Sequence, residues 1–191
     1  MKIQVIIGSV RPNRFAEKPA QWIAEEARKR EGLDVELLDL RDYPMPFFAE
    51  SMAPARMQGK YPNEVVAQWA RKITEADGYI MVSPEYNHGY SAVLKNALDH
   101  IYPEWNRKPV GFIGYGGVGG ARAIEQLRLV AIELEMAPIR PALHIPTDVY
   151  SAITSGKPDA YAPLKANTER FLDQLVWWTR ALKTAREQGG K

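Results

Sequence analysis

Cysteine is absent from the 191 residues of the chain. Its absence excludes disulfides, thiolate-ligated metals and a cysteine nucleophile, so any redox chemistry must depend on a bound cofactor. Histidine is scarce too, with three residues and no pair at the spacing of metal ligands. We therefore predict no metal site.

Long apolar runs and an excess of one charge are also missing. The first apolar run, Ile3–Ile7, is too short for a signal peptide, and no segment approaches the roughly 20 apolar residues that span a bilayer. The formal net charge is only +2, without a basic stripe that would indicate nucleic acid. We expect one soluble, cytoplasmic domain over residues 1–191, with no nucleic-acid partner and no inserted membrane segment.

Strand and helix patterns alternate along the chain. Short apolar runs predict five strands, at Ile3–Ile7, Leu33–Leu40, Gly78–Ser83, Val110–Tyr115 and Ile139–Ile145. Helical periodicity predicts the elements between and after them, at Phe15–Arg30, Pro62–Thr74, Ser91–Tyr102, Gly119–Met136 and Ala162–Arg186. This order is typical of an α/β domain with a parallel sheet.

Two further segments carry structural expectations. Residues 41–61 are rich in proline and methionine and are predicted to form a long loop. The last helix contains Trp177 and Trp178, of which we expect at least one to pack against the sheet. Because ligands bind parallel sheets at the carboxyl ends of the strands, the loops after the first, third and fourth strands are the candidate site.

The loop after the first strand has the composition of a phosphate site. Gly8 permits a sharp turn, Ser9 and Asn13 offer short polar side chains, and Arg11 and Arg14 bring two positive charges. The following helix directs free N–H groups into the same space. A Gly-x-Gly-x-x-Gly fingerprint and a Walker ending are both missing, which favours a terminal phosphomonoester. The alternative is a capped helix with two solvated arginines.

The loop after the third strand suits an aromatic heterocycle. Pro84 fixes the chain as it leaves the strand, and Asn87 and Gly89 tolerate a tight backbone. Tyr86 and Tyr90 supply flat amphipathic surfaces.

The loop after the fourth strand, residues 114–120, holds five glycines in seven positions. Glycine is entropically costly, so this density indicates a backbone that approaches something closely. N–H groups here, with the next helix N-terminus, would stabilise negative charge on a ligand. The alternative is a turn needed for tight helix packing.

The motif Pro-Glu-Tyr-Asn-His at residues 84–88, followed by Leu-Lys-Asn-Ala-Leu-Asp at 94–99, resembles the signature of the NAD(P)H-dependent FMN reductase family. Gly-Ser-x-Arg-Pro-x-Arg at residues 8–14 is similar to that family's phosphate loop. The resemblance runs from about residue 3 to 180. It implies a three-layer flavodoxin-like fold, with a five-stranded parallel sheet in the order 2-1-3-4-5 and helices on both faces.

The resemblance also implies an FMN site in three parts. The phosphate would be held by Ser9, Arg11, Asn13 and Arg14, with Phe15 beside it. The isoalloxazine and ribityl chain would be lined by Pro84, Glu85, Tyr86 and Asn87, whose N–H groups would serve the N5 and O4 edge. The pyrimidine side would face Gly116, Gly117, Val118 and Gly119. Many members carry Ser where Arg14 stands, and Pro or Gly near Ser91.

The implied activity is ping-pong hydride transfer from NADPH or NADH, through FMN, to a small acceptor such as free FMN, a quinone, an azo compound or a metal oxyanion. A homodimer or homotetramer is implied, with contacts from the helices after the third and fourth strands. Tyr102, Trp105 and the loop at 45–57 are candidate interface residues, with core packing as the alternative. Other functions are an electron carrier of the flavodoxin type and a flavin-dependent redox regulator.

Two titratable residues in the second loop allow catalytic interpretations. His88 could donate a proton, or it could fill space at a subunit contact. Glu85 could act as a general base, or it could contribute backbone to the flavin edge. We favour the second interpretation in each case, because the cofactor carries the difficult chemistry and needs no obligatory side-chain acid.

Overall fold

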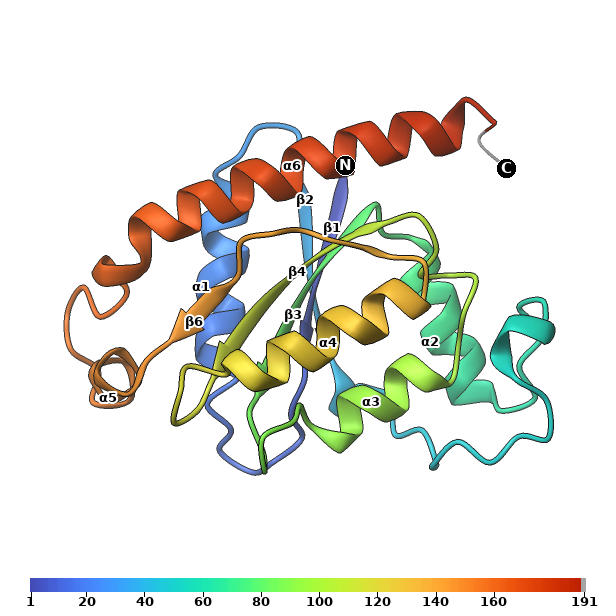
Figure 1. Cartoon of the computed structure of the whole chain (residues 1–191), viewed down its shortest axis with the longest axis horizontal. Helices are drawn as coiled ribbons and strands as arrows, with labels where there is room; N and C mark the ends of the chain where they lie inside the picture. Colours follow the sequence, from blue (N-terminus) through green and yellow to red (C-terminus); the bar gives the residue numbers. More distant parts are fainter. Residues whose placement is uncertain (190–191) are drawn as a thin grey trace.

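The computed structural model describes residues 1–189 and places a parallel sheet between two layers of helices (Figure 1). Its core strands are β1 (Lys2–Ile7), β2 (Asp34–Asp39), β3 (Gly78–Pro84) and β4 (Pro109–Tyr115). They lie in the order β2-β1-β3-β4 and all pairs are parallel. The predicted flavodoxin-like order is therefore confirmed. All residues of β3 and β4 are buried, as the unbroken apolar runs indicate.

The far edge of the sheet differs from the prediction of one strand at Ile139–Ile145. Two short strands take its place, β5 (Ala137–Pro138) and β6 (Leu143–Ile145), and both pair with β4. The segment between them contains Pro141, which has no N–H for a ladder bond. Arg128 instead binds the carbonyl oxygens of Ile139 and Arg140, at 2.8 Å each. The sheet therefore has six strands, with the fifth position divided.

The helices form two layers. Helices α1 (Glu17–Arg28), α5 (Thr147–Thr154) and α6 (Lys165–Glu187) bury apolar side chains in one core cluster. Helices α2 (Glu64–Thr74), α3 (Ala92–Asp99) and α4 (Ala121–Glu133) bury theirs in a second cluster, which includes the fully buried Trp105. Trp105 is therefore a core residue. Short 3-10 turns occupy Leu40–Asp42, Pro54–Arg56 and Ala162–Leu164.

Helix α6 corrects the expectation for its two tryptophans. Phe171, Leu172 and Leu175 supply the buried face of this helix. Trp177 and Trp178 are 61% and 39% exposed. Their rings pack against one another, with centroids 5.1 Å apart. Neither tryptophan is a core residue.

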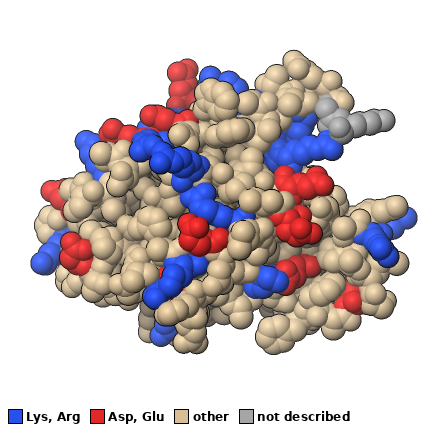
Figure 2. Space-filling view, viewed as in Figure 1, with Lys and Arg blue, Asp and Glu red and all other residues tan. Residues whose placement is uncertain are grey.

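The surface is mixed in charge. On the face drawn in Figure 2, basic and acidic side chains are interspersed. No helix of the described residues is long and apolar enough to cross a bilayer. The loops after β1, β3 and β4 meet at one end of the sheet, at the bottom of Figure 1, as the carboxyl ends of parallel strands must.

Candidate functional site

The loop after β1 is anchored where it leaves the strand. The Gly8 N–H donates to the Val82 carbonyl at 2.8 Å, and a Cβ on Gly8 would lie 2.6 Å from that oxygen. The buried Ser91 hydroxyl donates to the Gly8 carbonyl at 2.6 Å and also accepts from Leu94 N at the start of α3. Only glycine fits this close approach, so Gly8 fixes the start of the loop against β3.

Beyond Gly8 the loop backbone has almost no internal hydrogen bonds. Within the described residues, no protein acceptor is bound by the backbone N–H groups of Ser9, Val10, Arg11, Asn13 and Phe15, and Pro12 has no N–H. Three residues of the loop, Ser9, Arg14 and Phe15, are nonetheless buried. Asn13 adopts a left-handed conformation, with φ of 51°. Backbone N–H groups of buried residues normally have partners, so the open donors of Ser9 and Phe15 favour a site for an acceptor-rich ligand.

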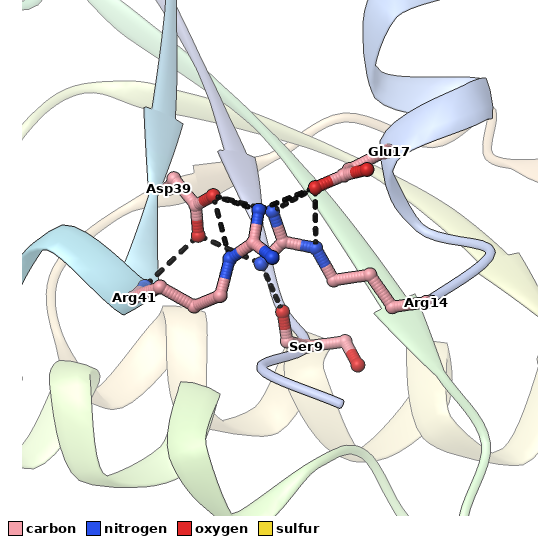
Figure 3. Close-up of polar contacts among 5 residues, drawn as sticks. All are labelled: Ser9, Arg14, Glu17, Asp39 and Arg41. Carbon is pink, nitrogen blue, oxygen red and sulfur yellow. Dashed lines mark hydrogen bonds and ion pairs between the residues drawn. The ribbon is translucent and has the colours of Figure 1, made fainter. Parts of the chain in front are cut away.

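Arg14 shapes this loop from inside the protein (Figure 3). Its side chain is 1% exposed. Nη1 donates to the Ser9 carbonyl at 2.5 Å and to Asp39 Oδ1 at 2.7 Å. Nε and Nη2 donate to Glu17 Oε1 at 3.2 and 2.6 Å, and Nη2 also donates to Asp39 Oδ2. All five N–H groups of the guanidinium are thereby used.

The geometry of Arg14 differs from the predicted direct contact with a phosphate. Because all the guanidinium N–H groups of Arg14 bind protein acceptors, this side chain has no donor left for a phosphate. Arg14 instead ties the Ser9 carbonyl to the start of α1, through Glu17, and to the end of β2, through Asp39. The other loop arginine, Arg11, is exposed and forms no ion pair with a carboxylate among the described residues.

The Asp39 carboxylate is held ionised. Burial alone would raise its pKa, but hydrogen bonds from Arg14 and Arg41 outweigh this effect and hold the pKa well below its usual range. Arg41 donates to Asp39 through both its backbone N–H, at 2.9 Å, and its guanidinium. The four charges of Arg14, Arg41, Asp39 and Glu17 therefore form one compensated cluster behind the loop.

Aromatic side chains surround the first loop on its other side. The Arg11 guanidinium lies 5.8 Å from the centre of the Tyr86 ring, and the Tyr86 hydroxyl is 3.4 Å from Ser9 Oγ. The Phe15 ring packs at 4.9 Å from Tyr115 and 4.2 Å from Tyr150. Neither Tyr115 nor Tyr150 was predicted at the site. Tyr115 is the last residue of β4, which is a usable signal, but Tyr150 lies on the unpredicted helix α5.

The loop after β3 ends in a tight two-residue turn. Tyr86 N donates to the Gly89 carbonyl at 2.8 Å, and Gly89 N donates to the Tyr86 carbonyl at 3.0 Å. The central residues Asn87 and His88 have φ of 50° and 69°. Because Glu85 N also has a partner, the Tyr115 carbonyl, the Asn87 N–H is the donor in residues 84–87 that remains open to a ligand within the described structure.

Glu85 is buried as a link between two loops. Its side chain is 3% exposed and pairs with Arg122. The carboxylate accepts from Arg122 Nε at 2.6 Å and from Arg122 N, at the start of α4, at 3.1 Å. Burial would raise the pKa of Glu85, but these bonds lower it below its usual value. A paired, ionised carboxylate supports a structural role over that of a general base.

The glycines after β4 divide into two kinds. A Cβ on Gly114 or Gly120 would lie within 3 Å of the other residue, so this pair is required for packing α4 against β4. Gly117 differs, because a Cβ there would meet nothing within 4 Å and its φ is not positive. The N–H groups of Gly117 and Val118 have no acceptor among the described residues. Tight helix packing therefore explains Gly114 and Gly120. A backbone that approaches a ligand stays the expectation for Gly117.

The structure brings the three predicted loops together through direct contacts. Ser9 meets Tyr86, Glu85 meets Tyr115 and Arg122, and Gly116 lies against Glu85, where a Cβ would be 3.0 Å from the Glu85 Cβ. Open N–H donors from all three loops, an arginine with no carboxylate partner among the described residues and a tyrosine ring gather at this edge of the sheet. Such a donor set suits a ligand with a phosphate, an aromatic ring and carbonyl or nitrogen acceptors, as FMN has.

The charge cluster behind the first loop should contribute measurably to the stability of the protein. Asp39→Asn should lower the free energy of unfolding by about 3 kcal/mol near neutral pH, because it leaves a buried arginine partly unpaired. The folded pKa of Asp39 lies below the unfolded value of about 3.9. Its contribution is therefore present above about pH 4 and is lost as pH falls through the folded pKa.

Urea unfolding from pH 7 to pH 3 measures this difference. The difference in the free energy of unfolding between the wild type and Asp39→Asn should become smaller below about pH 4. Asp173→Asn, which removes an exposed pair with Arg30, is the matched control and should cost under about 1 kcal/mol. If the two substitutions lowered the free energy of unfolding equally, the buried pair of Asp39 and Arg14 would not have the proposed stabilising effect.

Comparison with known proteins identifies the family of the chain. A family model described as NADPH-dependent FMN reductase matches residues 1–149. An NAD(P)H-dependent FMN reductase from Schizosaccharomyces pombe is 43% identical over 149 residues, covering 77% of this chain and 74% of that protein. A 2-hydroxy-1,4-benzoquinone reductase from a Burkholderia species is 29% identical over 188 residues, covering 94% and 97%.

A solved flavoenzyme shares the fold. The NAD(P)H:(acceptor) oxidoreductase from Paracoccus denitrificans superposes with a TM-score of 0.73 at 23% identity, covering 94% of this chain and 97% of that one. The family model and the S. pombe relative go further than the fold. They show that this chain belongs to the NADPH-dependent FMN reductase family.

Proposed function

We propose that this chain binds FMN at the carboxyl edge of its sheet and acts as an NAD(P)H-dependent reductase of a small acceptor. The observation that carries the proposal is the loop of residues 9–15, where the N–H groups of Ser9 and Phe15 are open although both residues are buried. A protein leaves such donors unpaired where a ligand supplies the acceptors. A terminal phosphate offers several acceptor oxygens in one small group.

The residues have distinct proposed tasks. Arg11 and the open backbone of residues 9–15 would bind the phosphate, with Ser9 and Asn13 beside them and Phe15 as an apolar wall. Arg14 would hold the loop in shape without touching the ligand. Pro84, Glu85, Tyr86 and Asn87 would line the ring and ribityl chain, with the Asn87 N–H as donor. Gly116, Gly117, Val118 and Gly119 would face the pyrimidine side, where the N–H groups of Gly117 and Val118 are open.

When bound, FMN supplies two-electron chemistry between a nicotinamide donor and an acceptor. The chain itself offers one such site and no second nucleotide fingerprint, so donor and acceptor are expected to take turns and give ping-pong kinetics. The benzoquinone named for the Burkholderia relative supports a quinone as the class of acceptor. The cytoplasmic location expected from the sequence stays a prediction.

The reductase proposal is tested by mixing the purified flavoprotein anaerobically with NADPH or NADH. The visible flavin absorbance should bleach, and adding a quinone should restore it over repeated cycles. An absorbance that dithionite bleaches but both nucleotides leave unchanged would contradict the proposal. That result would favour an electron carrier with a protein partner.

The phosphate task is tested separately with Arg11→Ala. Loss of a charged hydrogen bond should weaken FMN binding by about 1.5–3 kcal/mol, measured by titrating apoprotein and following flavin fluorescence. Riboflavin, which lacks the phosphate, should bind the variant and the wild type equally. Arg170→Ala, an exposed arginine on α6, is the control. An equal loss for riboflavin and FMN would place Arg11 against the ring instead of the phosphate.

We also propose self-association through α4. Leu129 and Ile132 on this helix are 71% and 63% exposed, and Phe47 in the loop after β2 is 82% exposed. Exposed large apolar side chains are typical of an interface core. The helix also starts at the candidate flavin site, so its partner surface would adjoin that site.

Light scattering after size-exclusion chromatography tests this surface. The wild type should run as a dimer or tetramer, and Leu129→Arg with Ile132→Arg should give a smaller species, because two charges cannot be buried unpaired. Trp177→Arg is the control, since this residue is as exposed but lies on α6. A monomeric wild type, or dissociation by the control alone, would refute an α4 interface.

A further inference from the structure

The turn at Asn87–His88 has a conformation that one of its residues disfavours. Both residues have positive φ, as in the type I′ turns that join two-residue hairpins. Asparagine accepts this region readily, and glycine is favoured at the second position. Histidine adopts positive φ more often than most residues with a Cβ, but less readily than glycine. Contacts from elsewhere in the protein would therefore help to hold His88 in this conformation.

Helix α4 supplies the stabilising contacts. Arg122 and Gln126 lie four residues apart and so share one face of the helix. Arg122 Nη1 lies 2.8 Å from His88 Nε2, and Gln126 Nε2 donates to the His88 carbonyl at 2.9 Å. Because arginine has only donors, His88 Nε2 is the acceptor in this contact. The turn is thus held at both its side chain and its backbone.

Two neighbouring contacts fix the direction of these side chains. The buried Glu85 carboxylate binds Arg122 Nε at 2.6 Å, which orients the guanidinium toward His88. A Cβ on Gly89 would lie 3.0 Å from Gln126 Oε1, so the end of the turn is packed closely on Gln126. The outward side of Arg122 stays partly exposed, at 43%.

We propose that Arg122 and Gln126 are positioning residues that hold the Asn87–His88 turn in the conformation that binds flavin. The inference rests on the proposed function, because Asn87 carries the open N–H donor of the second loop. Releasing His88 from α4 would let the turn relax and move that N–H away from the ligand. Arg122 and Gln126 would then affect flavin affinity without touching the flavin.

The double variant Arg122→Ala with Gln126→Met tests this role. Loss of both contacts should raise the FMN dissociation constant by about 10- to 100-fold. The melting temperature of the apoprotein should fall as well, because the Glu85 carboxylate loses its partner. Glu125→Ala, an exposed residue on the same helix, should change neither value. If the double variant does not fold, Arg122→Lys and Gln126→Met are measured singly, each with a smaller loss expected.

A second substitution separates positioning from direct contact. His88→Gly creates Asn-Gly, the pair that a type I′ turn favours, and should need no help from α4. Added to the double variant, His88→Gly should restore most of the lost FMN affinity, whereas His88→Ala should not. The single variant His88→Gly should bind FMN about as the wild type does.

The outcomes separate the two proposals. A wild type that binds no FMN overturns the proposed function itself. A wild type that binds FMN, with a double variant of equal affinity, overturns the positioning role alone. A double variant that stays weak after His88→Gly also overturns it, because the side chains of α4 would then contact the ligand directly.

Discussion

The buried guanidinium of Arg14 determines the shape on which the candidate site depends. The loop after β1 has no backbone ladder of its own, so its path must be set by side chains. Arg14 uses all its donors to connect the Ser9 carbonyl, the first turn of α1 and the end of β2. A planar fork with five donors can make these connections at once, which a lysine cannot.

This arrangement divides the work between side chains and backbone. Charged side chains around the site bind one another: Arg14 pairs with Asp39, and Arg122 with Glu85. Because these side chains are paired with one another, the donors that remain for a ligand are backbone N–H groups. They belong to three loops at the same edge of the sheet. Fixed backbone donors stabilise developing negative charge without reorganising, which suits a cofactor whose reduction adds electrons. We therefore propose no catalytic acid or base in this site.

The sequence predicted best what depends on local patterns. The run Gly78–Ser83 lies in β3, because a short apolar segment that begins at a glycine fits a strand buried in a sheet that is covered on both faces. The prediction of a strand at Ile139–Ile145 was wrong in part because Pro141 interrupts the ladder. The buried positions at this end of α6 are Leu175 and Thr179. Trp178 follows Phe171 by seven residues, so helical periodicity alone favoured burial, yet this residue is 39% exposed.

The role of Arg14 depended on a partner 25 residues away in the sequence. Parallel pairing aligns Ile7 with Asp39, and this register places the carboxylate beside the loop that follows Ile7. Composition alone shows two arginines in the predicted phosphate loop. It does not show which of them binds the protein's own carboxylates. The contacts of Glu85 and His88 with α4 likewise come from tertiary packing, although the motif marked both residues as part of the site.

A crystal structure of the FMN complex tests the central claim most directly. The account predicts the phosphate within the loop of residues 9–15, bound by backbone N–H groups and Arg11. Arg14 should remain on Asp39, Glu17 and the Ser9 carbonyl. A phosphate bound by Arg14 after it has left Asp39, or a flavin bound away from this edge of the sheet, would contradict the account.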